Sequence, residues 1–169
     1  MLAMESENRV RIKFLVSLQP GLHMRDLQRL MGLSFSATRH HVEKLVKKGE
    51  IDRSEDGGYS RLYPAGTSNE DQVLFSLLRA ETDRKLLASL LEEASLSPKR
   101  LCDLTGLAKS TVSEHLAHLS RLGIVRIAFT ATRGVSYELT NPTKIRLRID
   151  QSQTLRRKAT GRFIELWDF

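Results

Sequence analysis

The chain has little of several features that define common classes of protein. Its 169 residues include a single cysteine, Cys102, which excludes an internal disulfide framework and suits a reducing cytoplasm. No apolar run approaches the roughly 18 residues of a membrane span, and the N-terminal "MLAMESENRV" lacks the charged-then-apolar layout of a secretory signal. Phosphate-binding glycine loops, nucleophile elbows and paired acid–base groups are also missing. We therefore expect a protein that is not an enzyme and that binds no cofactor.

Acidic residues are the minority, and the resulting charge of +7 is unevenly spread. Residues 1–65 hold 11 basic and 8 acidic residues, residues 66–140 hold 9 of each, and residues 141–169 hold 7 and 3. A basic excess favours a polyanionic partner, with nucleic acid the first candidate. A charge of this size can also serve only to keep a protein soluble.

A repeat is the clearest positive feature of the sequence. "LMGLSFSATRHHVEKLVKKGEI" at residues 30–51 and "LTGLAKSTVSEHLAHLSRLGIV" at 104–125 align without a gap, at an offset of 74 residues, and 7 of the 22 positions are identical. Chance gives roughly one or two matches at average residue frequencies. One structural unit is therefore present twice.

Each copy predicts the same order of elements: a helix, a short helix, a tight turn, a longer helix and a β-hairpin. In the first copy, Pro20-Gly21 ends the first helix, the short helix spans Met24–Met31, and Ser34 is a natural N-cap for the longer helix, which runs to about Lys48. In the second copy, we expect Thr82 to cap the first helix. Both hairpins have turn residues at their tips, Asp56-Gly57-Gly58 and Arg133-Gly134.

These elements predict a mainly α fold with small β-hairpins (α+β), arranged as two tandem domains and a tail. We place the first domain at residues 1–66. A linker helix and the second domain occupy 67–140, and a basic C-terminal helix with an apolar, aromatic end occupies 141–169. Asn141-Pro142 is expected to start that last helix.

The order of elements and the pattern "GLS-S-T--H---L-K-G-I" resemble the winged helix-turn-helix domains of MarR/ArsR-type prokaryotic transcription regulators. Two such domains in tandem resemble a group common among archaeal regulators. The resemblance covers about residues 10–140. It implies a regulator that binds double-stranded DNA, works in the cytoplasm in association with the nucleoid, and dimerises through segments that follow the winged helix.

The longer helix of the first copy is the expected reader of DNA. With Thr38 at the centre of the buried face, the opposite face predicts Phe35, Ser36, Arg39, His40, Lys44 and Lys47 as DNA-binding residues. Arg39 is the best candidate to read a base, because a guanidinium pairs bidentately with guanine, and the lysines suit phosphates. The alternative is an ordinary solvated helix face.

The second copy is less basic, and its role stays open between an accessory reader and a platform. Its equivalent helix offers Lys109, Ser110 and Ser113, but Glu114 at the centre of that face repels phosphates. Its hairpin offers Arg126 and Arg133, which are candidates for minor-groove contact.

The tail is apolar where it ends. We predict dimerisation through Ile149, Leu155, Phe163, Ile164, Leu166, Trp167 and Phe169. Packing back onto its own domain and lying on an anionic membrane are alternatives.

The sequence leaves two alternatives to a DNA-binding regulator. A tandem winged-helix scaffold that binds proteins, similar in layout to the kleisin-binding subunits of bacterial condensin, is the main alternative. RNA binding is weaker, because few aromatic residues are placed for base stacking. The histidines lack the cysteine or carboxylate neighbours of a metal site, so no metal is expected.

Overall fold

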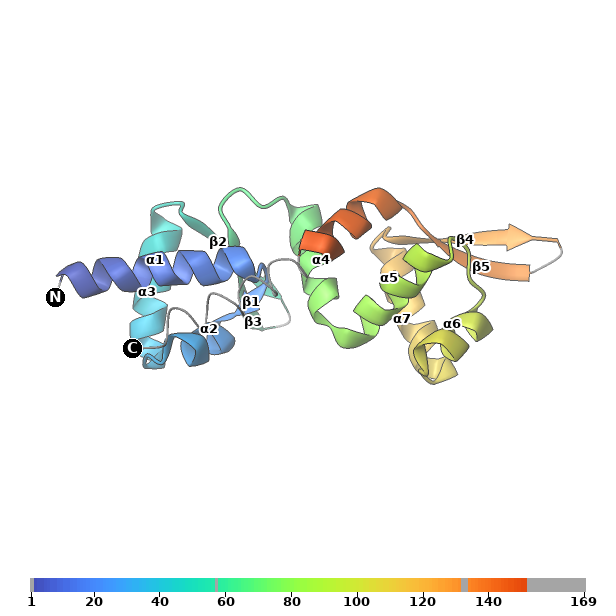
Figure 1. Cartoon of the computed structure of the whole chain (residues 1–169), viewed down its shortest axis with the longest axis horizontal. Coiled ribbons are helices and arrows are strands. Elements are labelled where there is room, and N and C mark those ends of the chain that lie inside the picture. Colours follow the sequence, from blue (N-terminus) through green and yellow to red (C-terminus); the bar gives the residue numbers. More distant parts are fainter. Residues whose placement is uncertain (1, 57, 132–133, 152–169) are drawn as a thin grey trace. The chain divides into compact units, whose positions relative to one another are not determined.

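The computed structural model describes residues 2–151 apart from residue 57 and residues 132–133 (Figure 1). These residues form two compact units, one from the N-terminus to Ser76 and one from Leu77 to Asp150. We call them unit 1 and unit 2. Both units are built mainly from helices, and each carries a small antiparallel sheet, which confirms the predicted fold class.

Unit 1 contains three helices and a three-stranded sheet. Its elements are α1 (Leu2–Leu18), β1 (Leu22–His23), α2 (Met24–Met31), α3 (Phe35–Lys47), β2 (Ile51–Asp56) and β3 (Tyr59–Pro64). The strand order is β1-β3-β2, and all pairs are antiparallel. We call the β2–β3 hairpin wing 1. The sequence did not predict β1, because a strand of two residues carries no periodic pattern.

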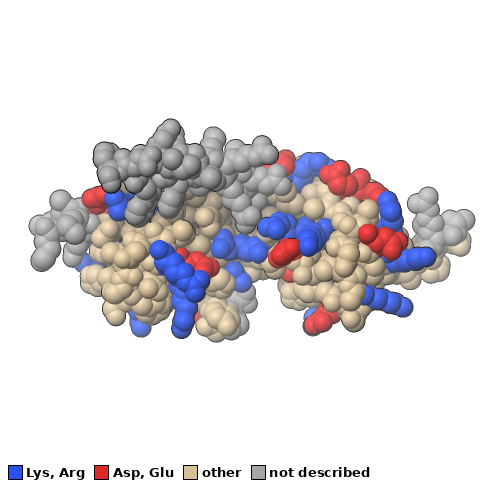
Figure 2. Space-filling model, turned by 60° about the horizontal axis from the view of Figure 1, so that its bottom comes forward, with Lys and Arg blue, Asp and Glu red and all other residues tan. Residues whose placement is uncertain are grey.

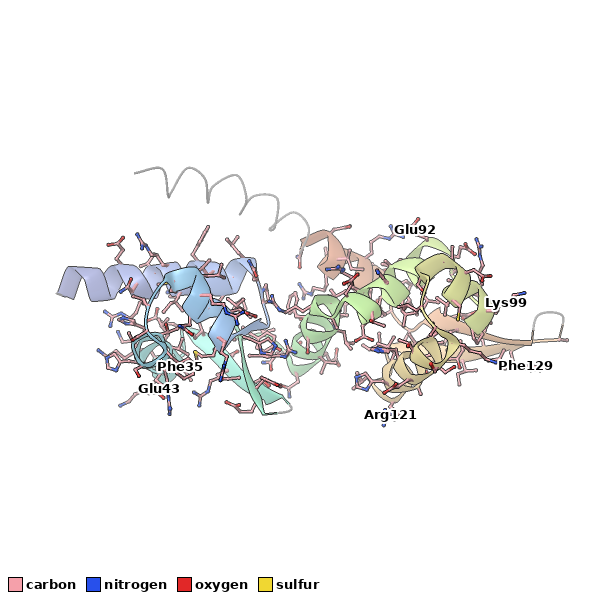
Figure 3. All side chains as sticks on the ribbon, turned by 90° about the horizontal axis from the view of Figure 1, so that it is seen from below. Phe35, Glu43, Glu92, Lys99, Arg121 and Phe129 are labelled. Atoms are coloured by element: carbon pink, nitrogen blue, oxygen red, sulfur yellow. The ribbon has the colours of Figure 1, made fainter. Side chains whose placement is uncertain are left out.

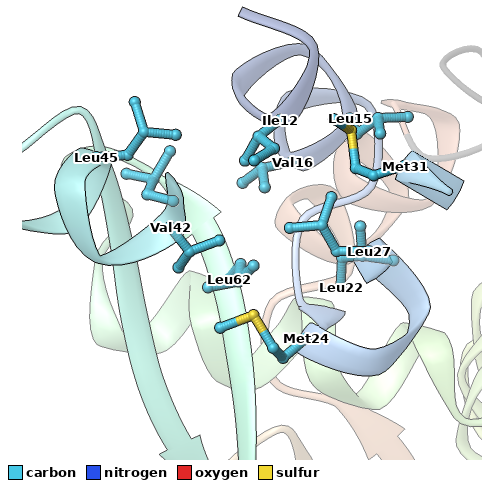
Figure 4. Close-up of a cluster of buried hydrophobic side chains, with 11 residues drawn as sticks. Ile12, Leu15, Val16, Leu22, Met24, Leu27, Met31, Val42, Leu45 and Leu62 are labelled. Atoms are coloured by element: carbon cyan, nitrogen blue, oxygen red, sulfur yellow. The ribbon is translucent and has the colours of Figure 1, made fainter. Parts of the chain in front are cut away.

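The core of unit 1 lies between α1, α2, α3 and the sheet (Figure 4). Apolar residues at helical spacing put one stripe of each helix into this core. Eleven buried side chains form it: Ile12, Leu15, Val16, Leu22, Met24, Leu27, Met31, Val42, Leu45, Ile51 and Leu62. Gly32 ends α2 in the left-handed conformation, at a φ of 64°. This turn lets α3 start in a new direction.

Helix α4 (Asn69–Arg79) contains the boundary between the units, which lies after Ser76 rather than at the predicted residue 66. The first turns of α4 are tied to wing 1. The Tyr63 hydroxyl donates a hydrogen bond to the Gln72 carbonyl oxygen, at 3.3 Å, and the Gln72 side chain donates to the Thr67 carbonyl oxygen, at 3.1 Å. These contacts place the start of the helix in unit 1.

Unit 2 repeats the plan of unit 1. Its elements are α5 (Glu81–Glu92), α6 (Pro98–Thr105), α7 (Lys109–Arg121), β4 (Val125–Thr130) and β5 (Gly134–Leu139), followed by a helix over 142–151. We call the β4–β5 hairpin wing 2. Thr82 lies inside α5 and does not cap it, so that prediction was wrong. The helix begins two residues earlier than that cap predicts, with Ala80 at the N-cap and no side-chain cap.

The helix over 142–151 begins as predicted, with Asn141 Oδ1 accepting a hydrogen bond from the Lys144 amide at 3.0 Å. As far as Asp150 it belongs to unit 2 rather than to a separate tail. Ile145 is buried there, and the Arg146 guanidinium donates to the Leu91 carbonyl oxygen at 3.1 Å. Amphipathic packing thus extends unit 2 past the predicted boundary at residue 140.

None of the helices within the described residues is long and apolar enough to cross a membrane.

Candidate nucleic-acid interface

Helix α3 is held with one face in the core and the other in solvent. Ser34 caps it, because the Ser34 Oγ accepts a hydrogen bond from the Ala37 amide at 3.2 Å. Thr38, Val42 and Leu45 are buried, at positions that share one helix face. The Thr38 hydroxyl also donates to the Ser34 carbonyl oxygen at 3.0 Å. The opposite face of α3 is therefore fixed in orientation and open to a ligand.

The open face carries the residues that the sequence predicted for DNA contact. Phe35, Ser36, Arg39, His40 and Lys47 are exposed, and Lys44 is half-buried. Figure 3 labels Phe35 and Glu43 on this helix. An exposed, basic face on a capped helix has the size and chemistry that the major groove of B-DNA accepts.

Arg39 is paired on its own helix. Its Nε lies 2.7 Å from Glu43 Oε1, and 62% of the arginine side chain is exposed. The hydrogen bond from Arg39 holds the pKa of the Glu43 carboxyl below its ordinary value. Arg39 therefore has to exchange this carboxylate for a base before it can read one. The sequence reasoning missed this pair, although the spacing of four residues signals it.

A concavity of about 540 Å³ lies beside the start of α3. Its walls come from α2, α3 and wing 1, and they carry four arginines against two acids: Arg25, Arg29, Arg39 and Arg53, with Asp26 and Glu55. Phe35 and Tyr59 add aromatic surface. Figure 2 shows a group of basic side chains, with acidic ones beside it, on the visible face of unit 1 at the left. Sequence reasoning did not find Arg25 or Tyr59, because this concavity exists only once the helices and the wing are folded together.

Helix α7 presents a different surface. Lys109, Ser110 and Ser113 are exposed as predicted, but Glu114 is exposed among them. Ala108 occupies the N-cap and makes no side-chain hydrogen bond. In Figure 2, acidic and basic side chains alternate over the right-hand lobe, which is unit 2. The Glu114 carboxylate lowers the attraction of this helix face for phosphates.

His115 on α7 is paired with a buried carboxylate of α5. The Nδ1 of His115 lies 2.7 Å from the Oδ1 of Asp83 on α5, and the Asp83 side chain is only 8% exposed. The offset of 74 places Arg9 at the corresponding position of unit 1. This pair fastens α5 to α7 and is a feature of unit 2 alone.

Each wing carries an arginine paired with a carboxylate, and in wing 1 the Arg53 Nε lies 3.6 Å from Glu55 Oε1. The Arg126 guanidinium donates twice to Glu138 on the neighbouring strand, at 2.9 and 3.1 Å. Arg133, the other predicted wing residue, lies outside the described residues.

Of the residues predicted for dimerisation, Ile149 is buried within its own unit. The others lie outside the described residues: Leu155, Phe163, Ile164, Leu166, Trp167 and Phe169.

Family models match parts of both units. A family model described as an N-terminal helix-turn-helix domain matches residues 6–75, and one described as winged helix-turn-helix DNA-binding matches residues 79–126. The chain is a tandem winged helix-turn-helix protein. The description of the second matched domain names DNA binding.

Solved structures resemble this tandem winged helix-turn-helix protein only distantly. A MarR protein from Peptoclostridium difficile is 16% identical, with a TM-score of 0.33 and 67% of each chain covered. The transcriptional regulator SlyA is also 16% identical, with a TM-score of 0.33 and coverage of 68% of this chain and 70% of the other. A hypothetical protein from Pyrobaculum spherical virus is 19% identical, with a TM-score of 0.38 and coverage of 81% and 97%. No curated protein matches the chain.

In this tandem winged helix-turn-helix protein, the two units have the same order of elements but differ in the residues that they expose. Unit 1 combines a capped, exposed helix with an arginine-lined concavity. Unit 2 combines an uncapped helix of mixed charge with a wing whose described arginine is paired. The four arginines gathered in one concavity distinguish unit 1, although unit 2 has the larger net charge, with 12 basic and 8 acidic residues over 77–150.

Proposed function

We propose that the protein is a transcriptional regulator that binds specific sequences of double-stranded DNA, chiefly through unit 1. The observation that carries the proposal is the position of α3, whose open basic face borders a concavity lined by four arginines. An α-helix fits the major groove, and arginine side chains beside it can hold the phosphates on either side.

Arg39 is the base-reading residue in this proposal. Its guanidinium is exposed, and a guanine edge offers two acceptors in place of the one Glu43 oxygen that it contacts in the free protein. Ser36 and His40 lie one turn or less away and donate to bases or phosphates. Lys44 and Lys47, further along α3, contact phosphates, and Phe35 packs at the entrance of the helix into the groove.

The concavity extends the contact beyond the recognition helix. Arg25 and Arg53 stand on opposite elements, α2 and wing 1, and both line it. A phosphate backbone that runs through this concavity meets positive charge on both sides. We propose that these residues set the register of the duplex, whereas Arg39 sets the sequence preference.

Unit 2 is an accessory DNA-binding domain in this proposal. Lys109, Ser110 and Ser113 line its exposed helix face and suit backbone contacts, and Arg126 and Arg133 extend them along wing 2. We further propose a homodimer that works in the cytoplasm on the nucleoid, with two unit 1 helices in successive major grooves about 34 Å apart. The apolar end of the chain is one candidate for the dimer contact.

A protein-binding scaffold is the second candidate function. It is favoured by the neutral charge of residues 66–140 and by the exposed apolar residues of wing 2. We rank it second, because it does not account for the gathering of four arginines in one concavity beside α3.

Selection from a pool of randomised duplexes tests sequence-specific reading. We expect wild type to enrich a motif with a conserved guanine, and Arg39→Ala to lose that guanine. A good bidentate contact is worth about 1–3 kcal/mol of discrimination. The matched control is Ser113→Ala, at the equivalent position of unit 2, which should keep the motif. Enrichment of no motif by wild type would contradict specific reading.

A further inference from the structure

The outer half of wing 2 exposes an apolar surface. Ile127 and Phe129 on β4 are 62% and 76% exposed, and Val135 on β5 is 43% exposed. Phe129 is paired in register with Val135, and Ile127 with Tyr137, so these side chains share one face of the hairpin. Figure 3 labels Phe129 on this hairpin. Such a cluster at the end of a hairpin is unfavourable in water unless something covers it.

Wing 1 shows that the fold does not require this surface. The offset of 74 places Arg53 and Glu55 of wing 1 at the positions of Ile127 and Phe129. Strand β2 carries four charged residues among its six, whereas β4 carries only Arg126. That single charge is neutralised by Glu138 on the other strand of the hairpin. The apolar face is therefore particular to wing 2.

The outer edge of β4 is open to a further strand. The outer edge of β5 is occupied, because Leu96 and Tyr137 exchange two backbone hydrogen bonds, at 2.8 and 3.1 Å. On its other side, β4 pairs with no strand among the residues that the structure describes. Proteins usually protect such edges with charged side chains, but the one charged residue of β4, Arg126, is paired with Glu138. An open, apolar edge is a site for strand addition.

We propose that this edge pairs with β4 of a second copy of the chain, in antiparallel orientation. A two-fold axis at Ala128 places Ile127 opposite Phe129 of the second copy, and Phe129 opposite its Ile127. The same register sets Arg126 opposite Thr130 of the second copy, so that no like charges face each other. Strands β4 and β5 carry one basic and one acidic residue, Arg126 and Glu138, which are paired, so the two hairpins bring no net repulsion into the contact.

This contact gives wing 2 a role in assembly that is distinct from the reading of DNA by unit 1. The pairing of two six-residue strands and four exposed apolar side chains forms a small interface. Interfaces at the small end of the range associate weakly. We therefore expect a dissociation constant of micromolar order, about 1–100 μM.

Sedimentation equilibrium of the full chain without DNA tests the proposal. The concentration runs from about 1 to about 200 μM, to bracket the expected range. We expect the mass of wild type to rise with concentration toward twice its starting value. Phe129→Glu should lower the association at least tenfold, because it buries a charge against Ile127 of the second copy. The Phe129 side chain is mostly exposed, so the variant is expected to fold.

Val10→Glu is the matched control, because Val10 is a similarly exposed apolar residue, at 64%, on α1 of unit 1. It should associate as wild type does. Ile127→Lys gives a second test on the same strand and should also prevent the rise in mass. Wild type that keeps one mass at every concentration would overturn the proposal. A rise that persists unchanged in Phe129→Glu and Ile127→Lys would overturn it too, and would place the contact elsewhere. DNA binding plays no part in either outcome.

Discussion

Removal of the Asp83 carboxylate should destabilise unit 2 and leave unit 1 intact. Asp83 joins the first turn of α5 to His115 on α7 through a contact of 2.7 Å. Asp83→Ala leaves the Nδ1 of His115 without its acceptor and removes a negative charge from the N-terminus of α5. Unit 1 has no equivalent carboxylate, because Arg9 stands at that position.

The size of the effect follows from the burial of the two side chains. Loss of one partner of a fully buried ion pair costs about 3–5 kcal/mol. Here the Asp83 side chain is 8% exposed but the His115 side chain is 30% exposed, so water can partly replace the lost partner. We therefore expect a loss of about 2 kcal/mol in the free energy of unfolding of unit 2. For a domain of this size, that corresponds to a fall in Tm of about 8–16 °C.

Amide hydrogen exchange separates the two units within the intact chain. Asp83→Ala should speed the exchange of α7 and β5 by about 30-fold, which is the factor that 2 kcal/mol represents when exchange follows unfolding. Exchange in α3 and β3 should not change. Asp83→Asn keeps an oxygen that accepts from His115 and should lose less stability. Equal acceleration in both units, or none in unit 2, would refute this reasoning.

Two further predictions concern the helices that bear the candidate interface. Ser34→Ala should lower the free energy of unfolding of unit 1 by about 1 kcal/mol, because Ser34 caps α3, and Ala108→Ser should raise that of unit 2 by a similar amount. Urea unfolding measures both changes. An unchanged unfolding midpoint for Ser34→Ala would contradict the role of Ser34 as a cap. Glu43→Gln should tighten DNA binding, because it frees Arg39 from its carboxylate and removes a charge that repels phosphates. Fluorescence anisotropy measures the affinity. Weaker binding by the variant would contradict this prediction and show that Glu43 aids recognition.

Local signals made much of the fold predictable from the sequence. The short helix was predicted over Met24–Met31 and has those bounds in the structure, because Pro20-Gly21 and Gly32 punctuate it on both sides. Ser34 was predicted to cap the next helix and does so. Hydrophobic periodicity and turn residues are local, so a single sequence can reveal them.

Features that depend on tertiary packing were less accessible. Strand β1 is too short to show a pattern, and it exists because β3 offers an edge to Leu22 and His23. The concavity joins Arg25 to Arg53, which lie 28 residues apart in the chain. The alternation of apolar and polar residues predicts a hairpin for each wing, but it does not show which edge of the hairpin stays unpaired. Exposure of Phe129 emerges only from the folded register.

The salt dependence of DNA binding, compared between Lys47→Ala and Arg121→Ala, tests the central claim most directly. The two residues occupy equivalent positions in the exposed ends of α3 and α7. If unit 1 is the principal DNA-binding unit, anisotropy measurements from about 50 to about 300 mM salt will show steep dependence for wild type. Lys47→Ala will lower the slope by about one, and Arg121→Ala will change it much less. Absence of wild-type binding even at the lowest salt, or a larger loss from Arg121→Ala, would contradict the account.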